Sequence, residues 1–206
     1  MLNRTMTESV RRFWDEQAAT FDEEPDHGLR DPAVRQAWAD LLLPLLPEPR
    51  HVTDLGCGTG TLAVLLAEAG HDVRGLDLAG EMVAAARRKA DAAGVAAEFR
   101  QGDAAEPPYE DGSTDVVLAR HVLWAMPDPG EALRRWTRLL RPGGMLILVE
   151  GRWHSDDGYG SVGIAAGECA LLVREHRGEA VVRLLPEPEY WGKQIDDERY
   201  LLVSAR

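Results

Sequence analysis

Three glycines at alternate positions, Gly56, Gly58 and Gly60, follow an apolar run that ends at Leu55 and precede a leucine-rich segment that begins at Thr61. A glycine-rich turn of this kind lets a ligand approach the backbone closely. The free N–H groups at the start of the helix that follows favour an anion. The spacing therefore indicates a binding loop for a nucleotide-like ligand.

Two acids frame this loop. Asp54 precedes it, and Asp77 ends the next predicted strand, where a carboxylate could accept both hydroxyls of a ribose. A P-loop needs a lysine followed by serine or threonine, and no lysine lies near Gly60. A dinucleotide-binding loop needs its third glycine one residue later, where the chain has Thr61. An NAD-type oxidoreductase is therefore disfavoured but stays open as an alternative.

The segments that must position these residues alternate between strand and helix. Apolar runs predict strands at 51–56, 71–77, 97–103, 113–122 and 145–152, with helical patterns between them. This order predicts an α/β fold, a doubly wound and mostly parallel seven-stranded sheet with helices on both faces. Such a sheet binds ligands at the carboxyl ends of its strands.

The two ends of the chain depart from this alternation. Helical segments at 10–21 and 33–46 predict a helical cap over residues 1–46, so that 47–206 would form the core of a single domain. After a helix at 167–178, strands at 180–185 and 198–206 predict an antiparallel hairpin at the sheet edge. A helix at 129–144 is expected to close on Pro142-Gly143-Gly144, and residues 153–167 read as a loop.

These motifs together resemble class I S-adenosylmethionine (SAM)-dependent methyltransferases over roughly residues 10–152. The stretch from Asp54 to Gly60 is similar to the family's first motif, D-x-G-x-G-x-G. The stretch from Asp77 to Met82 is similar to its D-x-S-x-x-M segment, with Ala79 in place of serine. The later motifs are matched by Gly102-Asp103-Ala104, Thr114-Asp115-Val116-Val117 and Leu140-Arg141-Pro142-Gly143-Gly144.

The resemblance implies a methyltransferase that binds SAM, with its amino-acid half on the glycine loop, its ribose at Asp77 and its adenine near Asp103. The opening segment 13–22 resembles the family's W-x-x-x-A-x-x-Y-D, with Phe21 in place of tyrosine. An aromatic ring there would cover the sulfonium. The expected cofactor-binding residues are Trp14, Phe21, Asp54, Gly56, Cys57, Gly58, Gly60, Asp77, Leu78, Met82, Gly102, Asp103, Ala104 and Arg120.

Two histidines, His121 and His27, are candidates for a general base. A base assists transfer to a hydroxyl or a protonated amine, and histidine suits neutral pH. His121 lies at the carboxyl end of the fourth strand, and His27 lies between the two predicted cap helices, where the resemblance implies a lid. Each has a structural alternative as a packed or hydrogen-bonded histidine. Pro107-Pro108-Tyr109 precedes the fourth strand instead of following it, so it indicates a rigid loop and not the N/D-P-P-Y motif of amino methyltransferases.

The composition restricts the partners. A formal net charge of -12 argues against nucleic acid, and the basic run Arg87-Arg88-Lys89 is typical of a solvated helix face. Cys57 and Cys169 form neither a disulfide framework nor a metal-ligand spacing.

The chain shows no apolar stretch long enough for a membrane span and no signal-peptide core. We expect a cytoplasmic monomer or homodimer that methylates O or N of a small molecule. Frequent Ala, Arg and Leu indicate a GC-rich bacterial source. In such bacteria, enzymes of this kind often modify secondary metabolites, so we associate the chain with bacterial secondary metabolism. A SAM-binding protein of the same fold without turnover is the alternative.

Overall fold

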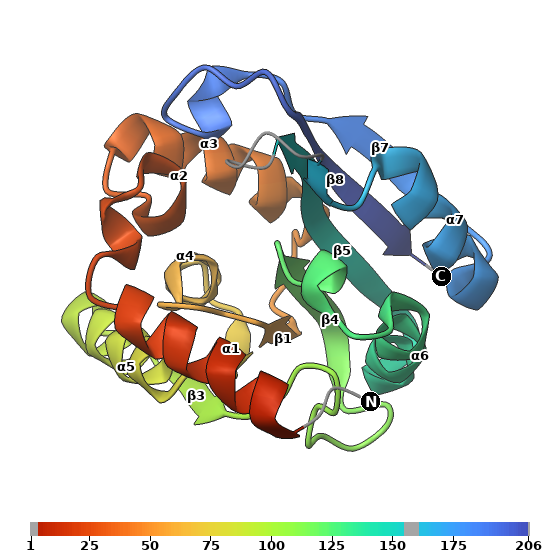
Figure 1. Cartoon of the computed structure of the whole chain (residues 1–206), viewed down its shortest axis with the longest axis horizontal. Coiled ribbons are helices and arrows are strands. Elements are labelled where there is room, and N and C mark those ends of the chain that lie inside the picture. Colours follow the sequence, from red (N-terminus) through yellow and green to blue (C-terminus); the bar gives the residue numbers. More distant parts are fainter. Residues whose placement is uncertain (1–3, 155–160, 206) are drawn as a thin grey trace.

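The computed structural model describes residues 4–154 and 161–205, and a twisted sheet runs through its centre (Figure 1). The strands are β1 (His51–Leu55), β2 (Asp72–Asp77), β3 (Ala97–Gln101), β4 (Thr114–Arg120), β5 (Leu140–His154), β6 (Ser161–Gly163), β7 (Val181–Leu184) and β8 (Glu198–Ala205). Their order is β3-β2-β1-β4-β5-β8-β7, with β6 paired to β5. Strands β1 to β5 run parallel, and β8 is antiparallel to both of its neighbours. The order reverses between β1 and β4, which predicts a ligand crevice at their carboxyl ends.

Helices cover both faces of this sheet. The α-helices are α1 (Arg4–Gln17), α2 (Pro25–Gly28), α3 (Pro32–Leu42), α4 (Thr61–Glu68), α5 (Gly80–Ala93), α6 (Pro129–Leu139) and α7 (Ala166–Arg177). Short 3-10 helices are η1 (Phe21–Glu23), η2 (Leu43–Leu45), η3 (Leu123–Ala125) and η4 (Pro188–Tyr190). One apolar layer joins the sheet to α3, α4 and α5, and a second joins it to α6 and α7. Helix α1 lies against α5 (Figure 1).

Local sequence accounts for several helix ends. Asp31 and Asp128 cap α3 and α6, because each side chain accepts a backbone N–H of the first turn, at 2.8 and 2.9 Å. A proline follows each cap, at a position where its missing N–H removes no helical hydrogen bond. Gly94 ends α5 with φ +68°, a left-handed conformation that glycine adopts without strain.

Three tryptophans, Trp38, Trp136 and Trp191, are fully buried in these layers. Each indole N–H donates to a backbone carbonyl, at 2.7, 2.7 and 2.8 Å respectively. A buried indole without such a partner would lose stability, so these bonds fix how each ring sits.

The α/β class, the parallel sheet and the antiparallel C-terminal strands are confirmed, but the predicted strand number of seven is wrong, because the sheet has eight. The additional strand lies in the predicted loop 153–167. There β5 continues to His154, and residues 152–154 pair with β6. Backbone pairing therefore orders part of a segment whose composition is typical of a loop. Residues 155–160 of that loop lie outside the described residues.

Two further boundaries differ. Helix α6 ends at Leu139, and Pro142-Gly143-Gly144 belong to β5, whose first residue, Leu140, already pairs with β4. Strands β7 and β8 pair as predicted, but the connection between them carries η4 and the buried Trp191 instead of a tight turn. Within residues 4–154 and 161–205, no helix has both the length and the apolar character that crossing a membrane requires.

Candidate active site

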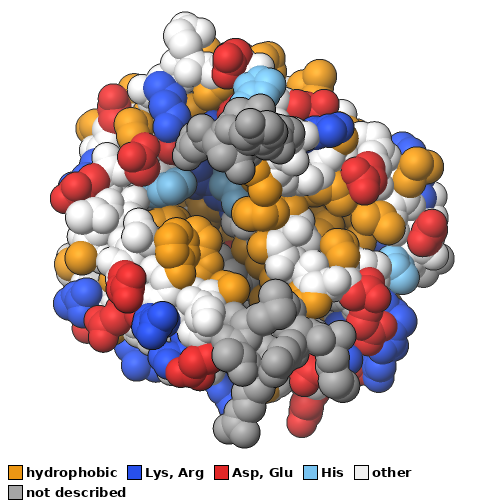
Figure 2. Space-filling model, in the orientation of Figure 1, with side chains coloured by type: hydrophobic (Ala, Val, Ile, Leu, Met, Phe, Trp, Pro, Cys, Tyr) orange, Lys and Arg blue, Asp and Glu red, His pale blue; other side chains and the backbone are white. Residues whose placement is uncertain are grey.

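The candidate site lies where the glycine loop joins β1 to α4, at the carboxyl ends of the parallel strands. Figure 2 shows a hollow near the centre of this face, with hydrophobic side chains on both sides and histidine side chains near its rim. Among the described residues, no group of three or more His, Cys, Asp or Glu side chains is placed to hold a metal ion.

The loop glycines all adopt left-handed backbone, with φ +70° at Gly56, +54° at Gly58 and +76° at Gly60. A Cβ at Gly56 would lie 2.3 Å from a methyl of Val122, and one at Gly60 would lie 2.7 Å from a Cβ of α5. At Gly58 the nearest atom to an added Cβ is 3.4 Å away, in the ring of Phe21. Backbone conformation and neighbouring protein atoms therefore require the glycines at 56 and 60, whether or not a ligand lies against them.

Asp77 holds this loop in place from the end of β2. Its Oδ2 accepts the N–H of Gly58 at 2.8 Å, and its Oδ1 accepts the N–H of Ala79 at 2.9 Å. Burial raises the pKa of Asp77, while these two amides act in the opposite direction. Each carboxylate oxygen keeps acceptor capacity, so the predicted role toward ribose hydroxyls is compatible with the geometry.

Asp54 is buried, at 3% exposed, in the second half of β1, just before the glycine loop. Burial, followed by the charge of Asp77, raises the pKa of Asp54 to about 7, and the charge of Arg120 acts against this. A buried carboxylate is costly unless a cation balances its charge. A bound ammonium group would remove that cost, so Asp54 is a candidate ligand contact.

Other predicted cofactor residues have clear packing roles. The sulfur of Cys57 packs against Gly75, where an added Cβ would lie only 2.8 Å from it. Burial raises the pKa of this thiol. Met82 is 2% exposed and packs in the interior. The Oδ1 of Asp103 accepts the N–H of Ala105 at 2.8 Å, a turn-capping bond that leaves its Oδ2 for a ligand.

Three more predicted residues lie around the ends of β2 and β3. The carbonyl of Leu78 accepts the Gln101 amide at 3.0 Å, and the N–H of Gly102 donates to the Asp77 carbonyl at 2.8 Å. Ala104 is buried, and its carbonyl accepts the indole of α6. These contacts fix the backbone there without using the side chains.

A row of rings leads from the surface of α1 to the glycine loop. Trp14 is 36% exposed and contacts the edge of Phe21, with ring centroids 6.1 Å apart. Phe21 stacks on His27 at 4.2 Å and 14° between planes. Burial lowers the pKa of His27, and its Nδ1 is buried without a partner among the described residues. The structure thus brings the three predicted cap residues together, next to Gly58.

An ion pair fastens this part of the cap to the loop. The Nζ of Lys89 lies 2.8 Å from Asp22 Oδ2 and also donates to Thr59 and Thr61, at 3.0 and 2.5 Å. The Thr59 hydroxyl donates to the other Asp22 oxygen at 2.5 Å. The basic run of α5 was expected to be solvated, but its last residue connects η1 to the start of α4.

Arg120, a predicted cofactor residue, connects β4 to the cap. Its guanidinium donates to the backbone carbonyl of Asp26 and lies 3.9 Å from the Asp26 carboxylate. It also lies over the Trp38 ring at 4.5 Å. Burial lowers the pKa of Arg120 to about 10, so the group remains charged at neutral pH. Its Nε is buried and has no partner among the described residues.

A second arginine completes this cluster from β8. Arg199 Nη1 donates to the Asp26 carboxylate at 3.0 Å, and its other nitrogens bind Asp197 at 2.8 and 3.1 Å. Its guanidinium lies 4.4 Å over the ring of Trp191. One buried aspartate on α2 therefore joins strands β4 and β8 to the cap.

His121 occupies a strained position directly after β4. Its φ is +58°, a left-handed value that costs a residue with a side chain about 1–2 kcal/mol. The imidazole meets the edge of Trp153 at 4.9 Å and lies 6.0 Å from Trp191. Both ring nitrogens are buried and have no partner among the described residues.

The electrostatic surroundings keep this imidazole neutral. Burial lowers the pKa of His121 well below its ordinary value, and the charges of Arg120, Arg199 and His27 act in the same direction. A neutral imidazole offers one donor and one acceptor nitrogen. His121 is therefore able to accept a hydrogen bond from a ligand at neutral pH.

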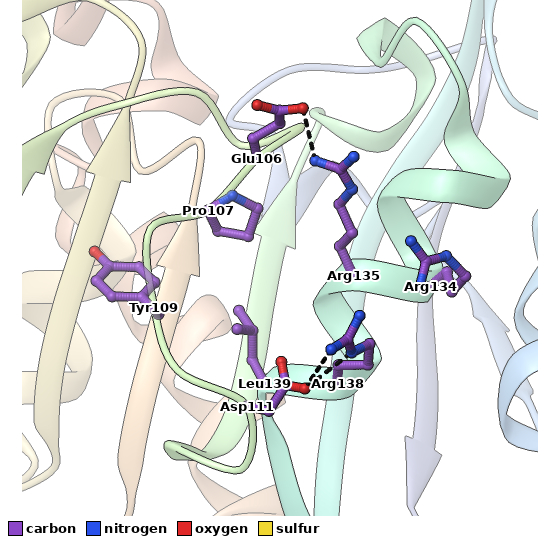
Figure 3. A pocket seen from close by; sticks show the side chains of 8 residues that line it. All are labelled: Glu106, Pro107, Tyr109, Asp111, Arg134, Arg135, Arg138 and Leu139. Atoms are coloured by element: carbon purple, nitrogen blue, oxygen red, sulfur yellow. Dashed lines mark hydrogen bonds and ion pairs between the residues drawn. The ribbon is translucent and has the colours of Figure 1, made fainter.

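A separate surface pocket lies between the loop before β4 and helix α6 (Figure 3). Its charged side chains already pair with one another, Arg135 with Glu106 at 2.9 Å and Arg138 with Asp111 at 2.6 Å. The predicted site residues are absent from its lining, so we do not assign the active site to it.

Sequence reasoning missed several residues of this site. Asp26 and Arg199 are 173 positions apart, and no local motif links them. Lys89 gave only the signal of a charged helix face. Glu150 carried a usable signal, because it is an acid that directly follows the apolar run of a central strand. Its side chain is fully buried.

The described residues fit SAM. Asp77 can accept hydroxyl groups, the buried carboxylate of Asp54 can accept an ammonium, and Phe21 offers an aromatic ring beside Gly58 to a sulfonium. A comparison with known protein families gives the same answer, because a family model described as "Methyltransferase domain" matches residues 53–148 of this chain.

Two curated relatives and one solved structure extend this match. The chain is 34% identical over 196 residues to a ubiquinone biosynthesis O-methyltransferase of Bordetella avium, covering 95% of this chain and 73% of that protein. It is 40% identical over 110 residues to a demethylmenaquinone methyltransferase of Thermus thermophilus, covering 52% of this chain and 50% of that protein. This chain therefore spans about half the length of the Thermus relative.

The solved structure is a geranyl diphosphate methyltransferase in complex with GPP and sinefungin, a SAM analogue. It superposes with a TM-score of 0.69 at 20% identity, over 83% of this chain and 77% of that one. The fold, the glycine loop and a relative matched along nearly the whole chain agree. This chain belongs to the SAM-dependent methyltransferases, and S-adenosylmethionine is its cofactor.

Proposed function

We propose that this methyltransferase transfers the methyl group of SAM to an oxygen or nitrogen of a small-molecule acceptor, with His121 as the general base. The observation that carries the proposal is the state of His121. Its two ring nitrogens are buried at the carboxyl end of β4, and neither has a partner among the described residues. Unsatisfied buried nitrogens at such a position are explained by a ligand that supplies the missing hydrogen bond.

The cofactor supplies a methyl group that its sulfonium already activates, so the protein chiefly contributes position and exclusion of water. Holding two reactants in place can contribute about 7–11 kcal/mol. The rings of Trp153 and Trp191 shield His121 from solvent on the strand side. Phe21 and His27 lie over the glycine loop on the cap side.

The surrounding charges favour a hydroxyl over an amine. Among the charged groups that act on His121, the guanidiniums of Arg120 and Arg199 have the largest effects. They would repel a protonated amine and stabilise an oxygen that becomes negative as His121 withdraws its proton. The Bordetella relative carries the name of an O-methyltransferase, which supports the same preference.

The acidic net charge of -12 supports a small molecule over a nucleic acid as acceptor. Segments 4–28 and 120–126 border the site and are our candidates for acceptor specificity. We place the enzyme in bacterial small-molecule metabolism, as a monomer or homodimer. Light scattering would determine which of the two it is.

Calorimetric titration with S-adenosylhomocysteine and labelled-methyl transfer into a small-molecule extract of the source cells test the proposal. We expect saturable binding and a labelled small product. His121→Ala should lower the transfer rate about 10²–10⁴-fold while leaving cofactor binding intact. His27→Ala tests the second candidate base in the same way. Full activity in His121→Ala would overturn His121 as the base, and full activity in both variants would exclude both histidines from that role.

Tight binding without any labelled product would instead favour a SAM-binding protein without turnover. Absence of heat with a folded protein would contradict cofactor binding itself.

A further inference from the structure

The turn that carries His121 is held from a neighbouring strand. The N–H of His121 donates to the carbonyl of Val149 at 2.8 Å. The next two amides, of Val122 and Leu123, both donate to Oε1 of Glu150, at 3.0 and 2.7 Å. Three consecutive N–H groups therefore bind two adjacent residues within β5, and two of them bind one side-chain oxygen.

Glu150 is an unusual residue for its position. It is 0% exposed, and it follows Leu146 and Leu148 on the same face of β5, where an apolar side chain would pack. Its Oε2 is buried without a partner among the described residues. A buried carboxyl with one unsatisfied oxygen lowers the stability of the fold. Core packing thus gives no reason for an acid at this position, whereas the two turn amides do.

The hydrogen bonds to Glu150 affect both His121 and the glycine loop. A left-handed residue such as His121 persists only where its surroundings hold it. The same turn lays Val122 against the glycine loop, because a methyl of Val122 occupies the space of a Cβ at Gly56. A shift of this turn would therefore move the imidazole and release one side of the loop.

We propose that Glu150 is a positioning residue of the methyl-transfer site, which fixes His121 and the Val122 contact with Gly56 through the amides of Val122 and Leu123. The proposal rests on the proposed function in one respect, namely that His121 is the base. Glu150 does not touch the reacting atoms, and it acts through the turn.

Two substitutions separate this role from simple core packing. Glu150→Gln keeps an oxygen that can accept both amides, and Glu150→Met keeps the volume but provides no comparable acceptor. Asp111→Asn, at an exposed ion pair, is the matched control for handling and charge. Glu150→Ala, which admits water to the amides, replaces the methionine variant if that variant does not fold.

The readout is the imidazole signal of His121 in carbon-13 NMR spectra, assigned by its loss in His121→Ala. In Glu150→Gln we expect the signal to stay in place, and in Glu150→Met we expect it to shift or broaden while that of the exposed His51 does not. The initial rate of labelled-methyl transfer into the small-molecule extract should fall about 100-fold in Glu150→Met and recover in Glu150→Gln.

An unmoved His121 signal in folded Glu150→Met, or an equal displacement in Glu150→Gln, would overturn the positioning role. The NMR readout needs no turnover, so it distinguishes this failure from that of the proposed function. If His121→Ala keeps full activity while the signal responds as expected, the base assignment fails and the positioning of the turn stands.

Discussion

Replacing Asp26 by asparagine removes the negative charge that joins α2 to two strands. The residue is 4% exposed, 3.0 Å from Arg199 and 3.9 Å from Arg120. Arg199 keeps Asp197 as a partner, but Asp26 is the one carboxylate within 4 Å of Arg120 among the described residues. Breaking a buried ion pair by removing one partner costs about 3–5 kcal/mol, because an uncompensated charge stays buried. We therefore expect Asp26→Asn to lose about this much free energy of unfolding.

For a protein of this size, each kcal/mol corresponds to roughly 2–4 °C, so the melting temperature should fall by roughly 6–20 °C. Thermal denaturation followed by circular dichroism measures this. The control is Asp111→Asn, which breaks an ion pair with Arg138 whose side chains are 60% and 56% exposed. Exposed pairs contribute up to about 1 kcal/mol, so the control should change by less than about 4 °C.

The pH dependence gives the prediction a second test. Burial raises the pKa of Asp26, but Arg120 and the other nearby cations outweigh it, so the folded-state pKa lies below the ordinary value of 3.8. A carboxylate with a lowered pKa contributes stability that is complete above its unfolded value and is lost as the pH falls through its folded value. The difference between wild type and Asp26→Asn should therefore shrink in acid. A melting temperature no lower than that of the control at neutral pH would refute the reasoning.

Three other predictions follow from single contacts. Gly56→Ala should lower the free energy of unfolding in urea by about 1–3 kcal/mol through its clash, and by more than Gly70→Ala, whose Cβ meets no atom within 4 Å. Lys89→Met removes the ammonium at 2.8 Å from Asp22, so amide hydrogen exchange over residues 21–28 should rise while the strands stay protected. Because the pKa of His121 is held well below 6.5, methyl transfer should show no inflection at that pH, and a midpoint there would contradict the neutral buried base.

Most of the fold could be predicted because its signals are local. Parallel strands buried on both faces read as apolar runs, and glycines or prolines mark several of the helix ends. The predicted strand boundaries were wrong where they depend on which strands pair with one another. Composition gave no sign that β5 would begin at Leu140 or that residues 152–154 would pair with Ser161–Gly163 to form an eighth strand. Strand pairing of this kind depends on contacts between segments, which a pattern along the chain does not display.

The glycine loop and its two acids could likewise be located from spacing, because the loop needs positive φ and its neighbours follow in order. The reason for the glycines could not be read in the same way. The methyl that requires Gly56 belongs to Val122, which is 66 residues later in the chain. The partners of Arg120 come from the cap, and no motif joins them to β4.

Arg120 and His121 are adjacent in the chain, and together they show why the site needs contacts between three distant segments, namely β4, α2 and β5. Burial keeps the imidazole neutral and the adjacent guanidinium adds to this effect, and a buried guanidinium requires a carboxylate, which α2 supplies through Asp26. The backbone of His121 must also stay left-handed, and Glu150 of β5 holds the turn that follows it. The cap and β5 therefore act on adjacent residues of one turn, so a change in either should alter the surroundings of His121. Without Asp26, the guanidinium of Arg120 beside His121 would lose its carboxylate partner. Without Glu150, the amides of the turn would lose their acceptor, and the backbone of His121 would no longer be held.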